Sequence, residues 1–268
     1  MMPGAANTCS AIYATQTGFP FCQYLSKAKT CRNKKISLTS CLNKGGYFST
    51  FITSTKLKYR GTRDILNSLQ YEVHGIEHLN SNSKMHEWGK NDRVLFDKAK
   101  DVYSKLVVTK KPFNLSLITI DTHFPKGYPD SEMDKYIDPS TPRGTHEFTY
   151  ACLSYHLADF IRFMKSQPNY ENTVVVIIGD HLLMGDKEIT PLVKKLGPLE
   201  DRRVMMLTNK KIKNFDFHDE IAFYDMQHII FDLLEVKTNV KMGKYLIPNY
   251  SKKFIEDNKY EFVFLARS

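Results

Sequence analysis

Side chains that commonly bind divalent cations follow two apolar segments of the chain. Asp180 and His181 come at the end of the run 173–179, and Asp121 and His123 follow a second apolar run. An aspartate and a histidine that leave a strand together can present oxygen and nitrogen to one divalent cation. An isolated Asp-His pair is more often a capping aspartate beside a surface histidine, and a lone loop histidine is more often structural than catalytic. The sequence alone therefore leaves both interpretations of these residues open, metal binding and a purely structural role.

A third candidate, Thr8, lies at the start of a short helical pattern that Gly18 closes and that Pro20 prevents from continuing. The free N–H groups and the dipole at the start of this helix would hold a phosphate beside the hydroxyl. A bound dication would lower the pKa of that hydroxyl and make it a competent nucleophile. The alternative is that Thr8 only caps the helix, which is a common role for threonine.

The elements that must position these side chains are short apolar runs that alternate with longer amphipathic segments. The pattern predicts strands over 47–52, 115–121, 173–179 and 203–208, and helices over 9–16, 36–44, 63–69, 92–108, 146–166, 189–196 and 224–236. This alternation predicts an α/β fold around a mostly parallel sheet. Nothing marks an internal boundary, so residues 1–268 are predicted to form one domain. Ligands of such sheets gather at the carboxyl ends of the strands, where the candidate residues lie.

The composition is that of an ordinary folded domain, with 42% hydrophobic and 25% charged residues, which excludes disordered and fibrous proteins. Thirty-eight Lys and Arg against 29 Asp and Glu give a net charge of +9 and indicate an anionic partner. The basic residues are scattered and no nucleic-acid motif is present, so a phosphate-bearing substrate or a membrane surface is favoured over nucleic acid. The sequence shows no signal peptide and no apolar stretch of the ~20 residues that a membrane span needs.

In this order along the chain, the threonine, the strand-end histidine and the Asp-His pair resemble the alkaline-phosphatase superfamily. More narrowly, they resemble its sulfatase-like phosphoglycerol transferases, such as lipoteichoic acid synthases and the enzymes that add phosphoglycerol to osmoregulated periplasmic glucans. The resembling segments are 8–21, 41–47, 87–89 with Asp92, 121–125, 174–182, and 224–225 with 230–234. The resemblance implies a three-layer α/β/α sandwich.

The resemblance also implies roles for individual residues. Thr8 would be the nucleophile and a metal ligand, Asp180 and His181 would be further metal ligands, and His123 would bind the phosphoryl oxygens and assist catalysis. The implied cation is Mn²⁺, with Zn²⁺ or Mg²⁺ in relatives. Phosphatidylglycerol would donate phosphoglycerol to Thr8, and a glycan or glycerol-phosphate hydroxyl would then accept it.

Two further substrate-binding candidates come from the same resemblance. The segment 56–63 falls where relatives place residues that grip the glycerol phosphate, and Arg60 is the candidate there. Lys58 and Arg63 are alternatives, and a solvated charge run explains any one of them equally well. Trp88, the only tryptophan, is expected either to wall the pocket or to anchor the core.

The chain departs from the family pattern at its start. Family members carry a metal-binding glutamate at the end of a first strand, and membrane helices before it, whereas seven residues precede Thr8 here. We therefore expect a catalytic domain without its first strand and membrane anchor, which puts the activity of these 268 residues on their own in question. The chain is either a piece of a longer protein or a complete protein that has lost the chemistry or borrows the strand. The intact form is expected to be membrane-anchored and to face the periplasm or the cell exterior.

Other functions remain to be weighed. A phosphoethanolamine transferase would share the threonine nucleophile, although Glu87-Trp88-Gly89 and the Asp-His-Leu ending favour the glycerol branch. A sulfatase or phosphodiesterase is the next alternative, but Cys9-Ser10-Ala11 lacks the Pro and Arg of the Cys/Ser-x-Pro-x-Arg sulfatase motif. An inactive remnant, or a basic module that binds anionic lipid or glycan, would fit the missing glutamate and the charge of +9.

Overall fold

Three parallel strands form the main sheet in the order β2-β1-β3. The structure, a computed structural model, describes residues 7–18, 37–57, 62–79, 82–183, 191–198, 202–212 and 221–237. Its strands are β1 (Phe48–Thr53), β2 (Glu72–His74), β3 (Phe113–Ile118), β4 (Val176–Ile178) and β5 (Met206–Thr208). Its α-helices are α1 (Thr8–Thr17), α2 (Leu38–Lys44), α3 (Thr62–Ser68), α4 (Asp92–Val108), α5 (His146–Lys165) and α6 (Met226–Leu233). Short 3₁₀ turns cover Ile76–His78, Ser131–Met133, Tyr170–Asn172, Pro191–Lys195 and Phe223–Asp225.

The strands do not all join one sheet. β4 pairs only with β5, in an antiparallel two-stranded sheet that is separate from β2-β1-β3 among the described residues. The main sheet is parallel throughout, as predicted, but the predicted strand 173–179 is shortened to three residues. The predicted helix 189–196 is a 3₁₀ turn in its described part. β2 was not predicted.

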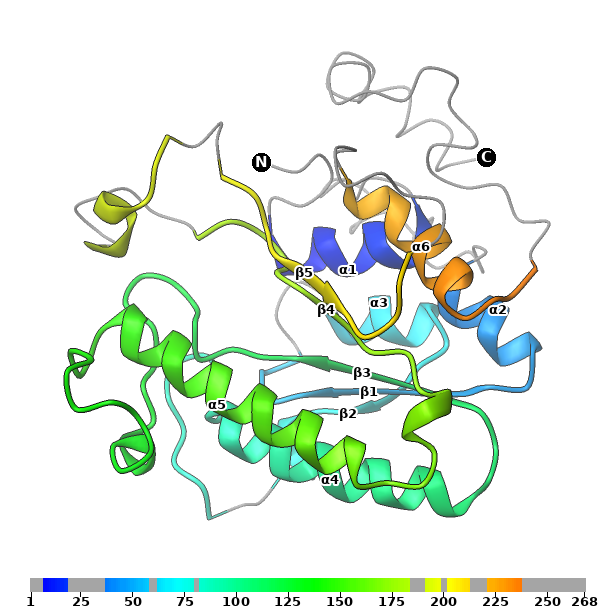
Figure 1. Cartoon of the computed structure of the whole chain (residues 1–268), viewed down its shortest axis with the longest axis horizontal. Helices are drawn as coiled ribbons and strands as arrows, with labels where there is room; N and C mark the ends of the chain where they lie inside the picture. Colours follow the sequence, from blue (N-terminus) through cyan, green and yellow to red (C-terminus); the bar gives the residue numbers. More distant parts are fainter. Residues whose placement is uncertain are drawn as a thin grey trace.

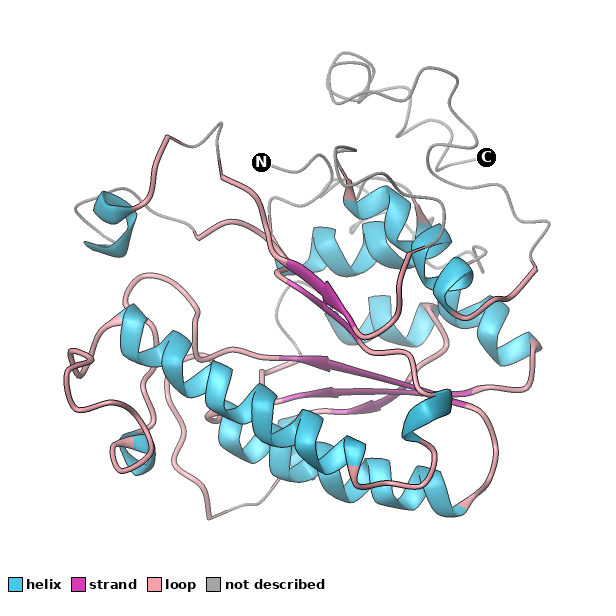
Figure 2. Cartoon of the chain, in the orientation of Figure 1, coloured by secondary structure: helices cyan, strands magenta, loops and turns pink. Residues whose placement is uncertain are grey.

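Helices cover both faces of the main sheet and make three layers (Figure 1). α4 and α5 lie on one face, where Tyr103, Leu95 and Phe160 form the largest apolar cluster. α1, α2, α3 and α6 lie on the other side (Figure 2). α4 and α5 each keep an amphipathic pattern, which explains why their bounds match the predicted ranges so closely. No helix in the described ranges is both long and apolar enough to cross a lipid bilayer.

α1 has the boundaries that the sequence analysis expected, with a different cap. Asn7 is the N-cap, since its side chain accepts a hydrogen bond of 3.1 Å from the backbone N–H of Ser10. Gly18 closes the helix in the left-handed conformation, with φ of 70°. Thr8 is therefore the first helical residue and not the cap, which rules out the capping role considered for it. Its hydroxyl is left for other contacts.

Candidate active site

The structure brings Thr8 and Asp180 together. The hydroxyl Oγ1 of Thr8 donates a hydrogen bond of 2.6 Å to Oδ2 of Asp180, across 172 positions of the sequence. α1 is anchored near β4, because its small residues Ala11 and Ala14 belong to the apolar cluster on which Ile178, the last residue of β4, packs. The end of β4 and the first turn of α1 thus meet at the side of the molecule toward which β1 and β3 also run (Figure 1).

His181 completes this group. Its Nε2 lies 3.5 Å from Oδ2 of Asp180, while its Nδ1 contacts the carbonyl oxygen of Leu182 at 2.8 Å. The other carboxylate oxygen of Asp180 accepts a hydrogen bond of 3.0 Å from the backbone N–H of His181. The hydroxyl oxygen of Thr8 and the imidazole Nε2 of His181 therefore both lie close to the carboxylate oxygen Oδ2 of Asp180.

This donor set fits a divalent cation. Atoms that share one tetrahedral metal ion with bonds of ~2.1 Å lie about 3.4 Å apart. His181 Nε2 and Asp180 Oδ2 are 3.5 Å apart, close to that value, whereas Thr8 Oγ1 is hydrogen-bonded to the same oxygen at 2.6 Å and would have to move away from it to share a cation. Three protein ligands are the usual number in catalytic zinc sites, and the mix of oxygen and nitrogen also suits Mn²⁺ or Mg²⁺. Within the described residues, no cluster of three or more His, Cys, Asp or Glu side chains is placed to hold a metal ion. The set depends on Thr8 as its third donor.

His123 and Trp88 form a second group at the end of β3. Their rings stack with centroids 4.1 Å apart and planes at 31°. Nδ1 of His123 contacts the carbonyl oxygen of Phe124 at 2.7 Å, which leaves Nε2 as the ring nitrogen available to a ligand. Trp88 thus packs on a predicted site residue, as the wall of a pocket would. The hydrogen bonds of His123 and Thr8 run to different partners, the carbonyl of Phe124 and the carboxylate of Asp180.

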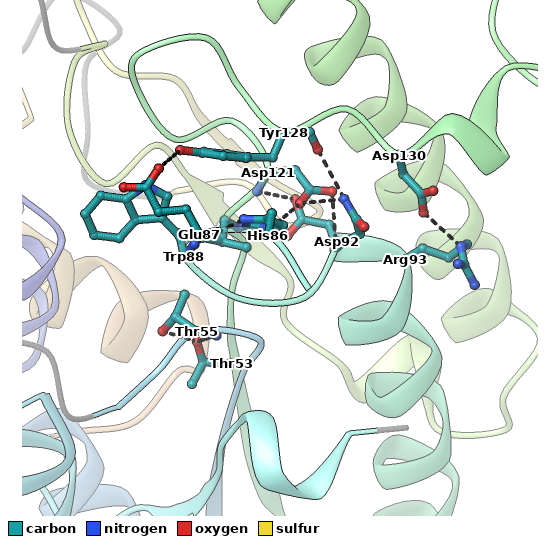
Figure 3. A network of polar contacts seen from close by, with 12 residues as sticks. Thr53, Thr55, His86, Glu87, Trp88, Asp92, Arg93, Asp121, Tyr128 and Asp130 are labelled. Atoms are coloured by element: carbon teal, nitrogen blue, oxygen red, sulfur yellow. Dashed lines mark hydrogen bonds and ion pairs between the residues drawn. The ribbon is translucent and has the colours of Figure 1, made fainter. Parts of the chain in front are cut away.

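A pair of buried carboxylates fixes the loop that carries His123 (Figure 3). Asp92, the first residue of α4, accepts hydrogen bonds of 2.8 Å and 3.3 Å from the backbone N–H groups of Ile120 and Asp121. Asp121 in turn accepts one of 2.9 Å from the N–H of Asp92 and one of 3.3 Å from the side chain of Asn91. The start of α4 and the end of β3 therefore cap one another.

Burial sets the electrostatics of this pair. Asp92 and Asp121 are 1% and 3% exposed. Burial, together with the neighbouring charge of Asp121, raises the pKa of Asp92 well above its usual range. Burial likewise raises the pKa of Asp121 to about 7. The pair consequently retains a proton at mildly acidic pH, and Asp121 serves to hold the loop rather than to bind a cation.

The loop that carries Trp88 is attached to the same network. His86 stacks on Tyr128 with ring centroids 4.4 Å apart, and its Nε2 lies 3.3 Å from a carboxylate oxygen of Asp121. The hydroxyl of Tyr128 donates a hydrogen bond of 3.1 Å to Glu87 (Figure 3). Burial lowers the pKa of His86. His86 and Tyr128 were not predicted from the sequence, although the Glu87-Trp88-Gly89 segment pointed to this loop.

Tyr150 lies on α5, and its side chain is 39% exposed. Partial burial, with a smaller contribution from the negative charge of Asp180, raises the pKa of its hydroxyl. The sequence analysis did not single out this residue.

The predicted basic substrate-binding residues are mostly outside the described part of the chain. Arg60 and Lys58 both fall in the range 58–61, which the structure does not describe. Arg63 is described, and it forms an ion pair with Glu77. That partner makes Arg63 less available to an anionic ligand than an unpaired arginine.

The structure is a three-layer α/β fold in which the hydroxyl of Thr8 and the imidazole of His181 lie beside Asp180, just beyond the carboxyl end of β4. Solved structures of other proteins share this fold. One is the lipoteichoic acid synthase LtaP from Listeria monocytogenes, with a TM-score of 0.72 and 18% identity, covering 91% of this chain and 65% of that one. Another is an alkaline phosphatase superfamily protein from Vibrio parahaemolyticus, with a TM-score of 0.72 and 19% identity, covering 94% of this chain and 61% of that one.

The chain belongs to the sulfatase family, whose family model matches residues 2–227. Among curated proteins, it is 26% identical over 196 residues to phosphoglycerol transferase I of Citrobacter koseri, covering 69% of this chain. The chain spans 26% of the length of that relative. A third solved structure, the Streptococcus pyogenes phosphoglycerol transferase GacH in complex with sn-glycerol-1-phosphate, has a TM-score of 0.63 and 12% identity, covering 99% of this chain and 74% of that one.

Proposed function

We propose that this chain is the catalytic part of a phosphoglycerol transferase that uses Thr8 as its nucleophile. The observation that carries the proposal is the 2.6 Å hydrogen bond from Thr8 Oγ1 to Asp180, with His181 Nε2 close to the same carboxylate oxygen. The similarity to phosphoglycerol transferase I supports the choice of phosphoglycerol as the transferred group. The donor in the proposal is phosphatidylglycerol, and the acceptor is a hydroxyl of a glycan or a glycerol phosphate.

In the first step, Thr8 Oγ1 attacks the phosphorus of the donor, and the bond from phosphorus to the diacylglycerol oxygen breaks. Phosphoglycerol is then esterified to Thr8 and diacylglycerol leaves with a proton. In the second step, an acceptor hydroxyl attacks the same phosphorus and releases Thr8. The two displacements conserve the phosphodiester charge.

The residues of the site have distinct tasks in this scheme. Asp180 accepts the hydrogen bond that orients the Thr8 hydroxyl toward the phosphorus. Because Nδ1 of His123 is held by the carbonyl of Phe124, Nε2 faces the donor, and in the protonated ring its N–H donates to the phosphoryl oxygens or gives its proton to the leaving oxygen. Trp88 fixes the ring plane of His123 by stacking. The N–H groups in the first turn of α1 stabilise negative charge on the phosphoryl group.

A divalent cation, Mn²⁺ in our proposal and Zn²⁺ or Mg²⁺ as alternatives, would be held by Thr8, Asp180 and His181. When bound, it would lower the pKa of the Thr8 hydroxyl and neutralise phosphoryl charge. In the intact protein, the site is proposed to face the periplasm or the cell exterior beside a membrane that supplies the lipid donor. The net charge of +9 favours approach to an anionic lipid surface.

The test combines calorimetry with a lipid assay. Mn²⁺ is titrated into the chain and into a Thr8→Ala, Asp180→Asn double variant, and both are then incubated with phosphatidylglycerol to measure released diacylglycerol. The proposal expects one binding site and diacylglycerol release in the parent chain and neither in the double variant. Thr141→Ala, in a loop with no side-chain role at the site, is the matched control and should behave like the parent.

The same assay separates the alternatives. Release of diacylglycerol from phosphatidylethanolamine but not from phosphatidylglycerol would assign the chain to phosphoethanolamine transfer. Metal binding that is equal in the parent and the double variant, without turnover, would leave an inactive remnant or an anion-binding module. Either result would refute the proposed function.

A further inference from the structure

The loop that carries Trp88 is fixed at its base by backbone hydrogen bonds. The N–H of His86 donates to the carbonyl of Gly89 at 2.8 Å. The N–H of Lys90 donates to the carbonyl of Ser54, just beyond the end of β1, at 3.0 Å. Neither of these bonds involves the peptide of Trp88, so the position of that peptide depends on side-chain contacts.

The side chain of His86 contacts that peptide. Its Nδ1 accepts a hydrogen bond of 3.3 Å from the backbone N–H of Trp88. Burial lowers the pKa of His86 although the negative charges of Asp92 and Glu87 act in the opposite direction, so the imidazole is neutral at pH 7. A neutral imidazole carries one proton, and because Nδ1 is an acceptor here, that proton is on Nε2.

Nε2 of His86 is buried and has no hydrogen bond of good geometry with the described residues. It lies 3.3 Å from Oδ1 of Asp121, which is an acceptor within reach (Figure 3). The ring of Tyr128 is stacked on the imidazole with planes at 15°, which lets the imidazole turn within its own plane. Because a buried N–H without an acceptor is costly, a small rotation that directs Nε2–H to Asp121 is favoured.

The contacts of His86, Trp88, His123 and Asp121 form a closed circle, which we call the His86 clamp. The rings of Trp88 and His123 stack at 4.1 Å, and His123 follows Asp121 by two residues in the same loop. The N–H of His123 donates to the carbonyl of Ile120 at 2.9 Å, which fixes the backbone on both sides of Asp121. His86 therefore connects the backbone that carries one stacked ring to the loop that carries the other.

We propose that His86 is a positioning residue that, with its proton on Nε2, sets the plane of the His123 ring through Trp88. Nδ1 holds the peptide of Trp88 and Nε2–H ties it to Asp121, so that the two stacked rings keep their register. A ring with a proton on Nδ1 has no acceptor for the N–H of Trp88 and releases it. The effect on catalysis rests on the proposed function of His123, whereas the arrangement of the clamp does not.

Nitrogen-15 NMR of the histidine rings tests the protonation of His86 in the unaltered full chain at pH 7. The signals of His86 are identified by their absence from His86→Asn. They should show a protonated Nε2 and an unprotonated Nδ1. A proton on Nδ1, whether alone or together with one on Nε2, would overturn the proposal.

Two substitutions separate the hydrogen bonds of His86 from its packing. His86→Phe keeps a flat ring against Tyr128 but removes both polar contacts, whereas His86→Asn keeps an oxygen near the position of Nδ1. In His86→Phe, acrylamide should quench the single tryptophan more strongly, and the ring signals of His123 should shift. Because His123 is then misplaced, diacylglycerol release should be about 10–100-fold slower. His86→Asn should recover part of each change.

His78→Phe is the matched control, because Nδ1 of His78 accepts the N–H of Gly75 at 3.2 Å in a similar local contact outside the clamp. It should leave quenching and diacylglycerol release unchanged. Both His86 variants should bind Mn²⁺ as the parent chain does, since neither changes a proposed metal ligand. Quenching and His123 signals in His86→Phe that match the parent would show that His86 only packs on Tyr128, and would overturn the proposal. A parent chain that releases no diacylglycerol would refute the proposed function, while the NMR and quenching results would still decide the role of His86.

Discussion

Replacement of Asp92 by asparagine isolates the buried carboxylate pair that positions His123. Asparagine keeps a carbonyl oxygen for the N–H of Ile120, which bonds to Asp92 at 2.8 Å in the parent chain. Its amide also gives Asp121 a hydrogen-bond donor in place of a second carboxylate. The substitution therefore imitates the protonated form of Asp92 at every pH.

Burial raises the pKa of Asp92 well above its usual range, so this carboxyl adds to the pH dependence of the parent chain and not to that of the variant. The pKa of Asp121, raised to about 7 from an ordinary value of 3.8, gives the scale of the effect of one such buried carboxyl. Since the folded chain binds a proton that the unfolded chain releases between these values, the free energy of unfolding falls as pH rises from about 4 to about 7. Roughly three pKa units at about 1.4 kcal/mol each give about 4 kcal/mol. This contribution to the free energy of unfolding is fully present below about pH 4 and is lost as the pH rises through about 7. This change is large against the 5–15 kcal/mol that is typical of whole domains.

Urea denaturation of the parent and of Asp92→Asn at pH 5, 6, 7 and 8 measures the difference. The variant should have the flatter pH profile, and it should gain stability relative to the parent as the pH rises. The buried histidines have the opposite pH dependence to the carboxyls, but they are present in both chains, so their contribution cancels when the two chains are compared. Asp232→Asn, at an exposed position of α6, is the control and should run parallel to the parent. Parallel profiles for the parent and Asp92→Asn would refute the shared-proton account of this pair.

Three smaller changes test the local structure around the site. A Cβ at Gly89 would overlap the carbonyl oxygen of Ser54 and lie 2.9 Å from the carbonyl carbon. Gly89→Ala should therefore lower the free energy of unfolding in urea by about 1–3 kcal/mol and shift the fluorescence of the single tryptophan. Gly197→Ala, with open space around the added Cβ, is the control and should do neither. Gln16→Ala removes a buried side chain that donates to the hydroxyl of Tyr71 at 2.8 Å and accepts from the hydroxyl of Thr39 at 2.6 Å. The free energy of unfolding should fall by about 3–5 kcal/mol. A fall below about 1 kcal/mol would contradict the burial of this network. Asn7→Ala removes the N-cap of α1 and should lower the free energy of unfolding by about 1 kcal/mol. If Thr8 in the first turn is a metal ligand, as proposed, the affinity for Mn²⁺ should fall by a larger fraction than the stability.

The elements with strong periodic patterns were predictable from the sequence. α4 has the predicted bounds of 92–108, and α5 ends one residue before the predicted limit, because each has a continuous apolar face. β2 was missed because it is a three-residue edge strand with polar residues at both ends. β4 is shorter than its apolar run, because the regular ladder extends only as far as its antiparallel partner β5.

The site was predictable where the family resemblance and a general rule of α/β folds applied. The rule that ligands gather at the carboxyl ends of strands pointed to Asp180, the resemblance implied that Thr8 lies beside it, and the structure brings these two within hydrogen-bond distance. The mutual capping of Asp92 and Asp121 follows no local pattern, because it depends on the approach of α4 to the end of β3. The sequence permits a disulfide between Cys22 and Cys31 in an oxidising compartment, and both residues lie outside the described part of the chain.

α1 makes the position of Thr8 depend on both sheets. Ile12 of this helix and Ile118 of β3 pack on one apolar cluster, whereas Ala11 and Ala14 belong to the cluster on which Ile178 of β4 packs. A shift of one sheet relative to the other would tilt α1 and change the distance from Thr8 to Asp180. A chain with misaligned sheets would therefore keep all of its candidate site residues and still lose the contact between Thr8 and Asp180.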